Sequence, residues 1–248
     1  IGGTEEAFVA MMNARAKSLG MTNSHFVDCC GLTDSNDHYS TARDIALMSR
    51  ELILKYPEIY NYTKIWMEDI THVTKQGSKQ FTLSNTNKLL RQFDGCTGLK
   101  TGSTSTAKYC LSATANRGGI DMIAVLLASP DSKTRFSEAA AMLNYGFSRC
   151  RLYKDEKPPA LTPLKVLKGK GDSVPLYYDG GFSYLDMDGA DLSAITRKEN
   201  IPDKIDAPVE KGDVVGSLDY YLGEEKIGSV SICAGERVLG AGFADYIK

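Results

Sequence analysis

The sequence lacks the features that would indicate a membrane protein or a nucleic-acid-binding protein. No apolar run approaches the roughly 20 residues that a membrane-spanning helix needs. The segment Ile1-Gly2-Gly3 has neither the basic region nor the apolar core of a signal peptide. The 29 basic and 31 acidic residues leave a net charge of -2, which gives no electrostatic basis for binding nucleic acid. Low-complexity tracts and internal repeats are also absent, so the 248 residues fit a globular protein of one large or two modest domains.

Cysteine is present, but its spacing matches no standard metal or redox motif. None of the six cysteines forms a C-x-x-C pair, and the adjacent Cys29 and Cys30 are poorly placed for an ordinary disulfide with each other. A site made from His25, Asp28, Cys29 and Cys30 can be imagined, but it lacks zinc-ligand spacing. We therefore expect no metal, and we expect the cysteines to be small buried apolar residues. They are Cys29, Cys30, Cys96, Cys110, Cys150 and Cys233.

Capping residues predict two helices near the start of the chain. Thr4 is a good N-cap for a helix over 5–19, because two acidic residues follow it in the first turn and a glycine follows the last one. A second helix is expected to begin at Ser40 or Thr41 and to end before Pro57. Its buried stripe should consist of Ile45, Met48 and Leu52.

The next segments predict an antiparallel sheet that is followed by a helix. Short connections between apolar runs favour antiparallel strands, and a helix with a broad apolar face would cover such a sheet. The fold class is therefore α+β. The expected elements are a hairpin at 65–83, strands at 98–103, 109–115 and 121–128, and a helix at 131–148.

A change in composition marks a second domain. The segment "KDEKPPALTP" at 154–163 is charged and rich in proline, which suits a linker. Beyond it, helix signals almost vanish, and short β-rich runs alternate with Gly and Asp turns. We therefore expect a first domain over 1–153, a linker over 154–163 and a small all-β domain over 164–248.

The triplet Lys100-Thr101-Gly102 lies in one of the expected strands. An edge strand can pair with an added peptide, and a glycine lets the peptide backbone come close because it has no Cβ. A lysine beside it can stabilise negative charge or polarise a nucleophilic hydroxyl. The triplet is thus suited to acyl transfer on peptides, although three such residues also occur by chance in solvated strands.

Longer blocks around the triplet resemble the low-molecular-mass penicillin-binding proteins, the serine D-alanyl-D-alanine carboxypeptidases. The blocks fall in the family's order over residues 1 to 150, and "PVEKGDVVGSLDYYL" at 208–222 resembles the family's C-terminal β domain. This resemblance implies a β-lactamase-like transpeptidase domain followed by a small all-β domain. The matching blocks are "HFVDCCGL" at 25–32, "HYSTARDIA" at 38–46, "NTNKLL" at 85–90, "DGCTGLKTGSTSTAKYCLSATA" at 94–115, "MIAVLLASPDSKTRF" at 122–136 and "LNYGF" at 143–147.

The resemblance also assigns roles to single residues. Enzymes of the family use three motifs, Ser-x-x-Lys, Ser-x-Asn and Lys-Thr-Gly, and the triplet at 100–102 matches the third. The backbone N–H of Ser103 matches the position that helps to form the oxyanion hole. Arginine suits carboxylate binding because its planar group can donate two parallel hydrogen bonds. The positions that match the family's carboxylate-binding residues are Thr101, Thr104 and Arg135.

The other two motifs are missing from this chain. Ser-x-Asn occurs nowhere, and Ser-x-x-Lys occurs only at Ser105 to Lys108, directly after the triplet. The family's nucleophile begins a buried helix on the other side of the cleft, and in this segment the family has a glycine where this sequence has Lys108. We therefore expect Ser105 and Lys108 to be turn residues, and the nucleophilic serine and its base lysine to lie upstream of Ile1.

The leading interpretation is a carboxypeptidase that removes the terminal D-alanine from peptidoglycan stem peptides and binds β-lactams. It implies no cofactor, a place on the outer face of the bacterial cytoplasmic membrane or in the cell wall, and membrane contact only through an anchor absent from this chain. A DD-endopeptidase, a β-lactamase and a non-catalytic peptidoglycan-binding module are the alternatives. A Ser-His-Asp hydrolase has less support, since no G-x-S-x-G elbow occurs. Its candidate histidines would be His25, His38 and His72.

Overall fold

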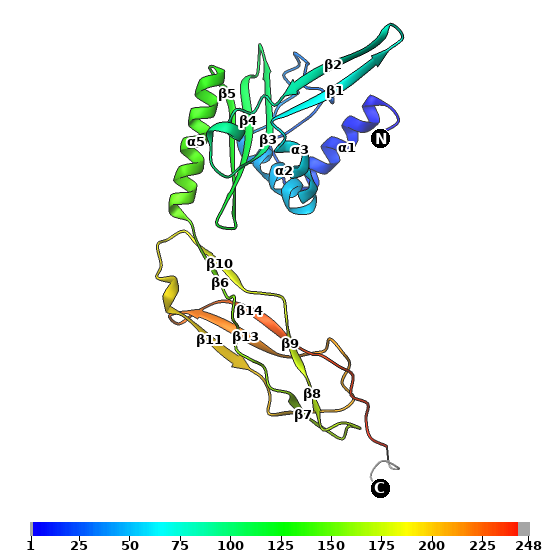
Figure 1. Cartoon of the computed structure of the whole chain (residues 1–248), viewed down its shortest axis with the longest axis vertical. Helices are drawn as coiled ribbons and strands as arrows, with labels where there is room; N and C mark the ends of the chain where they lie inside the picture. The colour runs from blue at the N-terminus through cyan, green and yellow to red at the C-terminus, as the bar shows by residue number, and fades with distance from the viewer. Residues whose placement is uncertain (1, 243–248) are drawn as a thin grey trace. The chain divides into compact units, whose positions relative to one another are not determined.

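A computed structural model describes residues 2–242, and its contacts divide the chain into two compact units, 1–148 and 149–248 (Figure 1). The boundary between the units in the sequence lies before the expected domain end at 153. The reason is that strand β6 (Arg151–Lys154) pairs with β10 (Ser183–Asp186) and so belongs to the second unit. The segment expected to be a linker, 154–163, thus lies within that unit. Among the described residues, no helix is long and apolar enough to cross a membrane.

The first unit is built on an antiparallel sheet of three strands in the order β3-β4-β5. The strands are β3 (Cys96–Thr104), β4 (Lys108–Arg117) and β5 (Ile120–Ser129). Helix α5 (Ser132–Arg149) follows β5 and lies along the sheet (Figure 1). Phe136, Ala139 and Leu143 of α5 are buried against Leu111, Ala113, Ala115, Ala124 and Leu126 of the sheet. Burial of these side chains is the main favourable term for this unit, and the α+β prediction is confirmed.

Helix α2 (Ala42–Lys55) begins after Thr41, whose Oγ1 accepts a hydrogen bond from the N–H of Asp44 at 3.2 Å. The predicted buried stripe of this helix is wrong. Met48 is 41% exposed, and the buried residues are instead Asp44, Ser49 and Ile53. Hydrogen bonding explains which face of the helix is buried, because Asp44 and Ser49 have to face polar partners when they are buried. The expected stripe of Ile45, Met48 and Leu52 borders an open apolar cavity.

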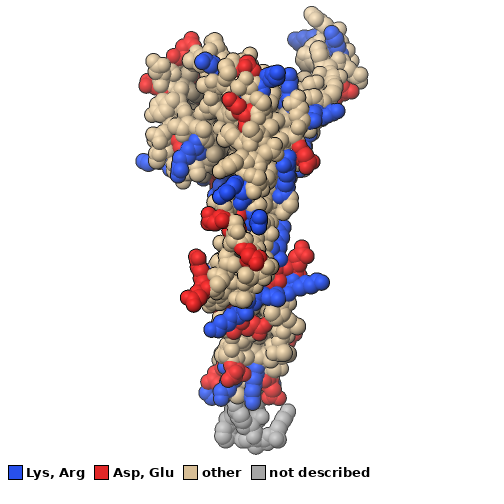
Figure 2. Space-filling model, turned by 90° about the vertical axis from the view of Figure 1, so that its left-hand side faces the viewer, with Lys and Arg blue, Asp and Glu red and all other residues tan. Residues whose placement is uncertain are grey.

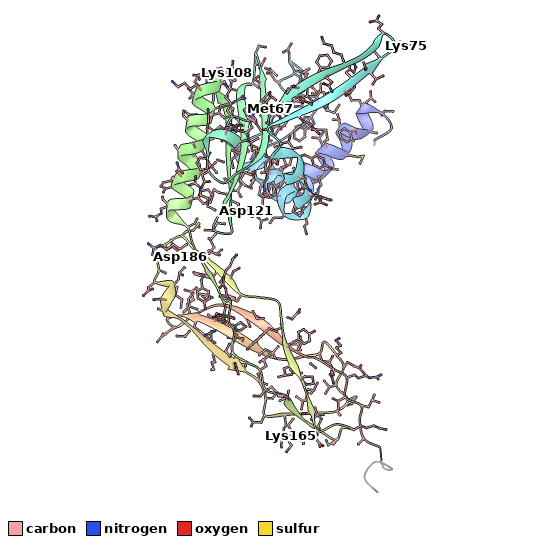
Figure 3. The ribbon with its side chains drawn as sticks, in the orientation of Figure 1. Met67, Lys75, Lys108, Asp121, Lys165 and Asp186 are labelled. Carbon is pink, nitrogen blue, oxygen red and sulfur yellow. The ribbon has the colours of Figure 1, made fainter. Side chains whose placement is uncertain are left out.

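The other elements of the first unit are short or exposed. Helix α1 (Glu5–Ser18) is capped by Thr4, whose Oγ1 accepts from the N–H of Ala7, as predicted. The hairpin of β1 (Met67–Thr74) and β2 (Gly77–Ser84) is fully exposed on both strands, and Lys75 lies at its tip (Figure 3). The remaining elements are η1 (Pro57–Ile59), α3 (Tyr60–Thr63) and α4 (Leu89–Gln92).

The second unit is made of strands, apart from the short helix η2 (Leu192–Ala194), so the all-β prediction is confirmed. Its largest sheet has the order β11-β13-β14-β9, and a second sheet has the order β12-β7-β8. The strands not yet given are β7 (Leu164–Leu167), β8 (Ser173–Val174), β9 (Leu176–Asp179), β11 (Ile195–Asn200), β12 (Lys204–Asp206), β13 (Val214–Leu222) and β14 (Glu225–Ala234).

Buried polar contacts fix the interior of the second unit. The Tyr220 ring stacks on Phe182 with centroids 3.7 Å apart, and its hydroxyl donates to Asp155 Oδ2 at 2.9 Å. Burial raises the pKa of the Tyr220 hydroxyl, and the neighbouring Asp155 carboxylate raises it further. Arg197 donates to both oxygens of Asp155, at 3.1 and 3.0 Å. These contacts satisfy the buried carboxylate, as a buried charge requires.

Candidate functional site

The Lys-Thr-Gly triplet lies on β3, which has only one strand neighbour in the described part of the sheet. Its register with β4 pairs Lys100 with Ser112, Thr101 with Leu111 and Gly102 with Cys110. The other side of β3 is therefore an edge, as the peptide-pairing hypothesis requires.

The two side chains of the triplet have different surroundings. Lys100 is exposed, and its ammonium group donates to the carbonyl oxygen of Thr101. Thr101 is buried, and its Oγ1 lies 2.5 Å from Oγ1 of Thr86. Sequence reasoning missed Thr86 as a site residue, although it lies within the "NTNKLL" block. The threonine pair fixes the rotamer of Thr101, while Lys100 places an exposed cation at the edge of the strand.

Gly102 has no structural need to be glycine in the described part of the molecule. Its φ angle lies outside the left-handed region, and a Cβ built on it would meet no heavy atom within 4 Å. Glycine weakens a strand interior, so a strand residue with free space around it gains nothing for stability from being glycine. The open space beside Gly102 is thus available to a ligand backbone.

An apolar cavity of about 500 Å³ lies between the triplet and helix α2. The stem of Lys100 lines it together with Leu99 and Leu111 of the sheet. Ser49 of α2 is hydrogen-bonded through its Oγ to Ser112 Oγ of β4 at 2.8 Å, which ties the helix to the sheet. The remaining residues that line this cavity are Ile45, Met48, Leu52, Ile59, Thr63, Thr101, Gly102, Cys110 and Leu127.

A second, polar cavity of about 390 Å³ lies at the end of β3. It is lined by the hydroxyl residues Ser103, Thr104 and Ser105 and by the cationic residue Lys108. Tyr109 and Pro130 complete the lining. The structure thus places Ser103 and Thr104 together in one cavity, as two of the expected substrate-binding residues.

Arg135, the third expected substrate-binding residue, reaches the sheet from α5. Its side chain is 6% exposed, and its Nη1 donates to the carbonyl oxygens of Gly102 and Cys110, at 3.0 and 3.1 Å. Its guanidinium carbon lies 5.4 Å from the centroid of the Tyr109 ring, and its buried Nε has no hydrogen-bond partner among residues 2–242. Arg135 therefore braces the β3–β4 pair from beneath and brings a positive charge close to the polar cavity.

Ser105 and Lys108 lie in and directly after a turn. Ser105 lies in the turn between β3 and β4, and Lys108 is the first residue of β4, opposite Thr104. No hydrogen bond joins Ser105 Oγ to Lys108 Nζ within the described range. The local hydrogen bond is instead from the N–H of Ala107 to Thr104 Oγ1, at 2.9 Å, and it closes the turn.

The histidines and cysteines assemble no metal-ligating cluster in the part of the chain that the structure describes. His25 Nδ1 lies 2.7 Å from the carbonyl oxygen of Asp37, and no group of three or more metal-ligating side chains is assembled. The expectation of buried cysteines is wrong for Cys29 and Cys30, which are exposed. The thiol of Cys29 lies 3.5 Å from the Glu5 carboxylate, and this hydrogen bond raises its pKa.

Two family models match the chain. The model of the D-alanyl-D-alanine carboxypeptidases matches residues 1–131, which is more than half of the 248 residues. The chain belongs to the D-alanyl-D-alanine carboxypeptidase family. The C-terminal domain of penicillin-binding protein 5 matches residues 147–239 of the same chain.

Single relatives agree with this assignment. The chain is 37% identical over 251 residues to the D-alanyl-D-alanine carboxypeptidase DacF of Bacillus subtilis, and the match covers 100% of this chain and 63% of DacF. It is 31% identical to DacC of Escherichia coli, with 98% of this chain and 59% of DacC covered. The chain thus spans about three fifths of the length of these curated relatives.

Solved structures of the family share the fold. Penicillin-binding protein 5 from Haemophilus influenzae superposes with a TM-score of 0.65 at 27% identity, over 96% of this chain and 68% of the other. The Streptomyces K15 DD-transpeptidase superposes with a TM-score of 0.53 at 37% identity, over 57% of this chain and 54% of the other.

Proposed function

We propose that this chain is part of a serine-type D-alanyl-D-alanine carboxypeptidase. The enzyme would remove the terminal D-alanine from peptidoglycan stem peptides through an acyl-enzyme, and β-lactams would acylate it. The observation that carries this proposal is the free edge of β3, where the open space beside Gly102 lies next to Lys100 on the wall of a cavity. A peptide can pair with that edge and bring its backbone up to the glycine.

Within this reaction the triplet Lys100, Thr101 and Gly102 would carry the catalytic work on this side of the cleft. The ammonium group of Lys100 would stabilise the negative charge that develops during acylation. The backbone N–H of Ser103 would donate to the oxyanion. The terminal carboxylate of the peptide would be bound by Thr101, Thr104 and Arg135.

We further propose that the nucleophilic serine and its base lysine belong to sequence outside these 248 residues. Acyl transfer needs a nucleophile within hydrogen-bond reach of its base. The in-chain candidates Ser105 and Lys108 lie in a turn and at a strand start without a mutual hydrogen bond, so they lack that arrangement.

The setting follows from the substrate. Peptidoglycan lies outside the cytoplasm, so we place the protein at the outer face of the bacterial membrane or in the wall, without a cofactor. The expected catalytic domain, residues 1–153, would correspond to the first unit, and the expected β-rich domain, residues 164–248, to the second.

Covalent labelling with a fluorescent penicillin tests the proposal. The full-length protein should form a penicilloyl adduct and release D-alanine from an acyl-D-Ala-D-Ala peptide. The 248-residue chain should form none, and the full-length protein with Ser105→Ala should still form the adduct. A full-length protein that forms no adduct would favour a non-catalytic peptidoglycan-binding module. An adduct that peptide sequencing maps to Ser105 would overturn the placement of the nucleophile.

A further inference from the structure

Lys108 has a backbone conformation that disfavours its residue type. Its φ angle is 53°, in the left-handed region where a Cβ is unfavourable and where glycine is the usual residue. Asn and Asp tolerate this region better than other residues, whereas lysine has no short polar group that bonds locally. A sequence selected only for the turn would have glycine at position 108. Backbone strain of this kind is concentrated at functional sites, which points to a use for the lysine side chain.

The surroundings of Lys108 indicate that use. The residue lies directly opposite Thr104 in the strand register, and both line the polar cavity with Ser103 and Ser105. Residues that face each other across an antiparallel pair have their Cβ atoms only about 5 Å apart. The hydroxyls and the ammonium group can thus contact the same polar group of a ligand.

The charge of Lys108 is not used by the protein itself. Within residues 2–242 its ammonium group has no hydrogen bond and no ion pair. Asp131 directly follows Pro130, which lines the cavity. Its two carboxylate oxygens accept hydrogen bonds from the N–H and the Oγ1 of Thr134, at 2.8 and 2.7 Å. Asp121 lies at the opposite end of the sheet from Lys108 (Figure 3). On the face that Figure 2 shows, acidic and basic side chains are interspersed.

Arg135 adds a second positive charge beside the same cavity. It is buried beneath the Tyr109 ring, which lines the cavity, and its Nε lacks a partner in the described structure. One cation and three hydroxyls that line the cavity, with a second cation beside it, suit a carboxylate, since charged donors make the strongest hydrogen bonds to anions. We propose that Lys108 is a specificity-determining residue, whose ammonium group selects peptides with a free C-terminal carboxylate. This inference rests on the proposed function and adds a residue to its substrate site.

Equilibrium binding tests the proposal without turnover. The probes are a reduced-amide analogue of an acyl-D-Ala-D-Ala peptide, which cannot be cleaved, and its C-terminal carboxamide. Their Kd values are measured on the full-length protein by NMR titration at low and at high salt. Wild type should prefer the carboxylate, and Lys108→Gln should lower the preference about fivefold, near the upper end for an exposed ion pair. Lys108→Arg should retain it, and salt should weaken it.

Two further variants separate charge from backbone strain. Lys108→Gly should lose the same preference and should raise Tm, because glycine accepts the positive φ without strain. Lys75→Gln, which removes an exposed lysine from the hairpin tip, should change neither quantity. An unchanged carboxylate preference in Lys108→Gln, or an equal loss for both probes, would overturn the inference. The penicillin-labelling experiment is independent of this result, so failure of the proposed activity would be seen separately.

Discussion

Replacing Gly102 by alanine should change stability and activity in opposite directions. The new methyl group would enter open space, with no heavy atom within 4 Å of the built Cβ, and the backbone angle suits any residue. A glycine-to-alanine change at such a position stabilises a protein by about 0.4–1 kcal/mol, because the unfolded chain loses freedom. The same methyl group would stand where the peptide backbone has to approach β3. An overpacked contact costs roughly 1–3 kcal/mol, which corresponds to a loss of about 5- to 160-fold in the acylation rate constant.

Two measurements and one matched control decide this prediction. Urea unfolding of the 248-residue chain gives the stability change, and stopped-flow labelling of the full-length protein with a fluorescent penicillin gives the acylation rate. Gly181→Ala is the control, because a Cβ at Gly181 also meets nothing and the residue lies in the second unit. It should gain similar stability and keep the wild-type rate. A Gly102→Ala variant that acylates as fast as wild type would refute the peptide-pairing geometry.

Three other changes test separate parts of the structure. Lys100→Ala should slow acylation by about 10²–10³-fold, as loss of one electrostatic contact to a developing charge does, and a near-normal stopped-flow rate would remove Lys100 from the site. Arg135→Met should reduce kcat/KM for a peptide with a free terminal carboxylate about 10- to 100-fold more than for its amide; equal losses would make Arg135 purely structural. Asp219 has its pKa lowered to about 2, mainly by the hydrogen bond from Lys226 at 2.7 Å. The ionised carboxylate stabilises the fold at pH values above its unfolded pKa of about 3.9, and this stabilisation is lost as pH falls towards 2. In Asp219→Asn, the stability measured by circular dichroism should therefore depend less steeply on pH over that range.

Local signals in the sequence were sufficient for most of the backbone. Thr4 and Thr41 cap the helices that were expected to follow them, because an N-cap acts on backbone N–H groups only two or three residues away. The three strands around the triplet were likewise found from apolar runs and short turns, which act within a hairpin. Such features depend on near neighbours in the chain, and periodicity detects them.

The side-chain environment depends on contacts between distant segments, and there the sequence misled. The helical periodicity of apolar residues in α2 predicted that Met48 would be buried. The helix instead turns Ser49 towards the sheet, where it bonds Ser112, which is 63 residues away in sequence. The role of Thr86 as the partner of Thr101 was missed for the same reason. Both contacts are pairs of small hydroxyl residues, which carry no periodic signal and occur throughout any soluble protein.

The triplet is held in place by segments outside its own hairpin. Thr86 fixes the threonine of the triplet, Ser49 bonds the neighbouring strand, and Arg135 donates to a carbonyl on each of the two strands. Binding and catalysis are efficient when donors are positioned before the ligand arrives, because no ordering is then required at that step. Only Lys100 and Lys108 of the proposed cations lack such anchors to distant segments, and both are exposed beside a cavity. A fixed strand edge with two cations that no distant segment holds can keep a peptide backbone in one register while each ammonium group adjusts to the charge it meets.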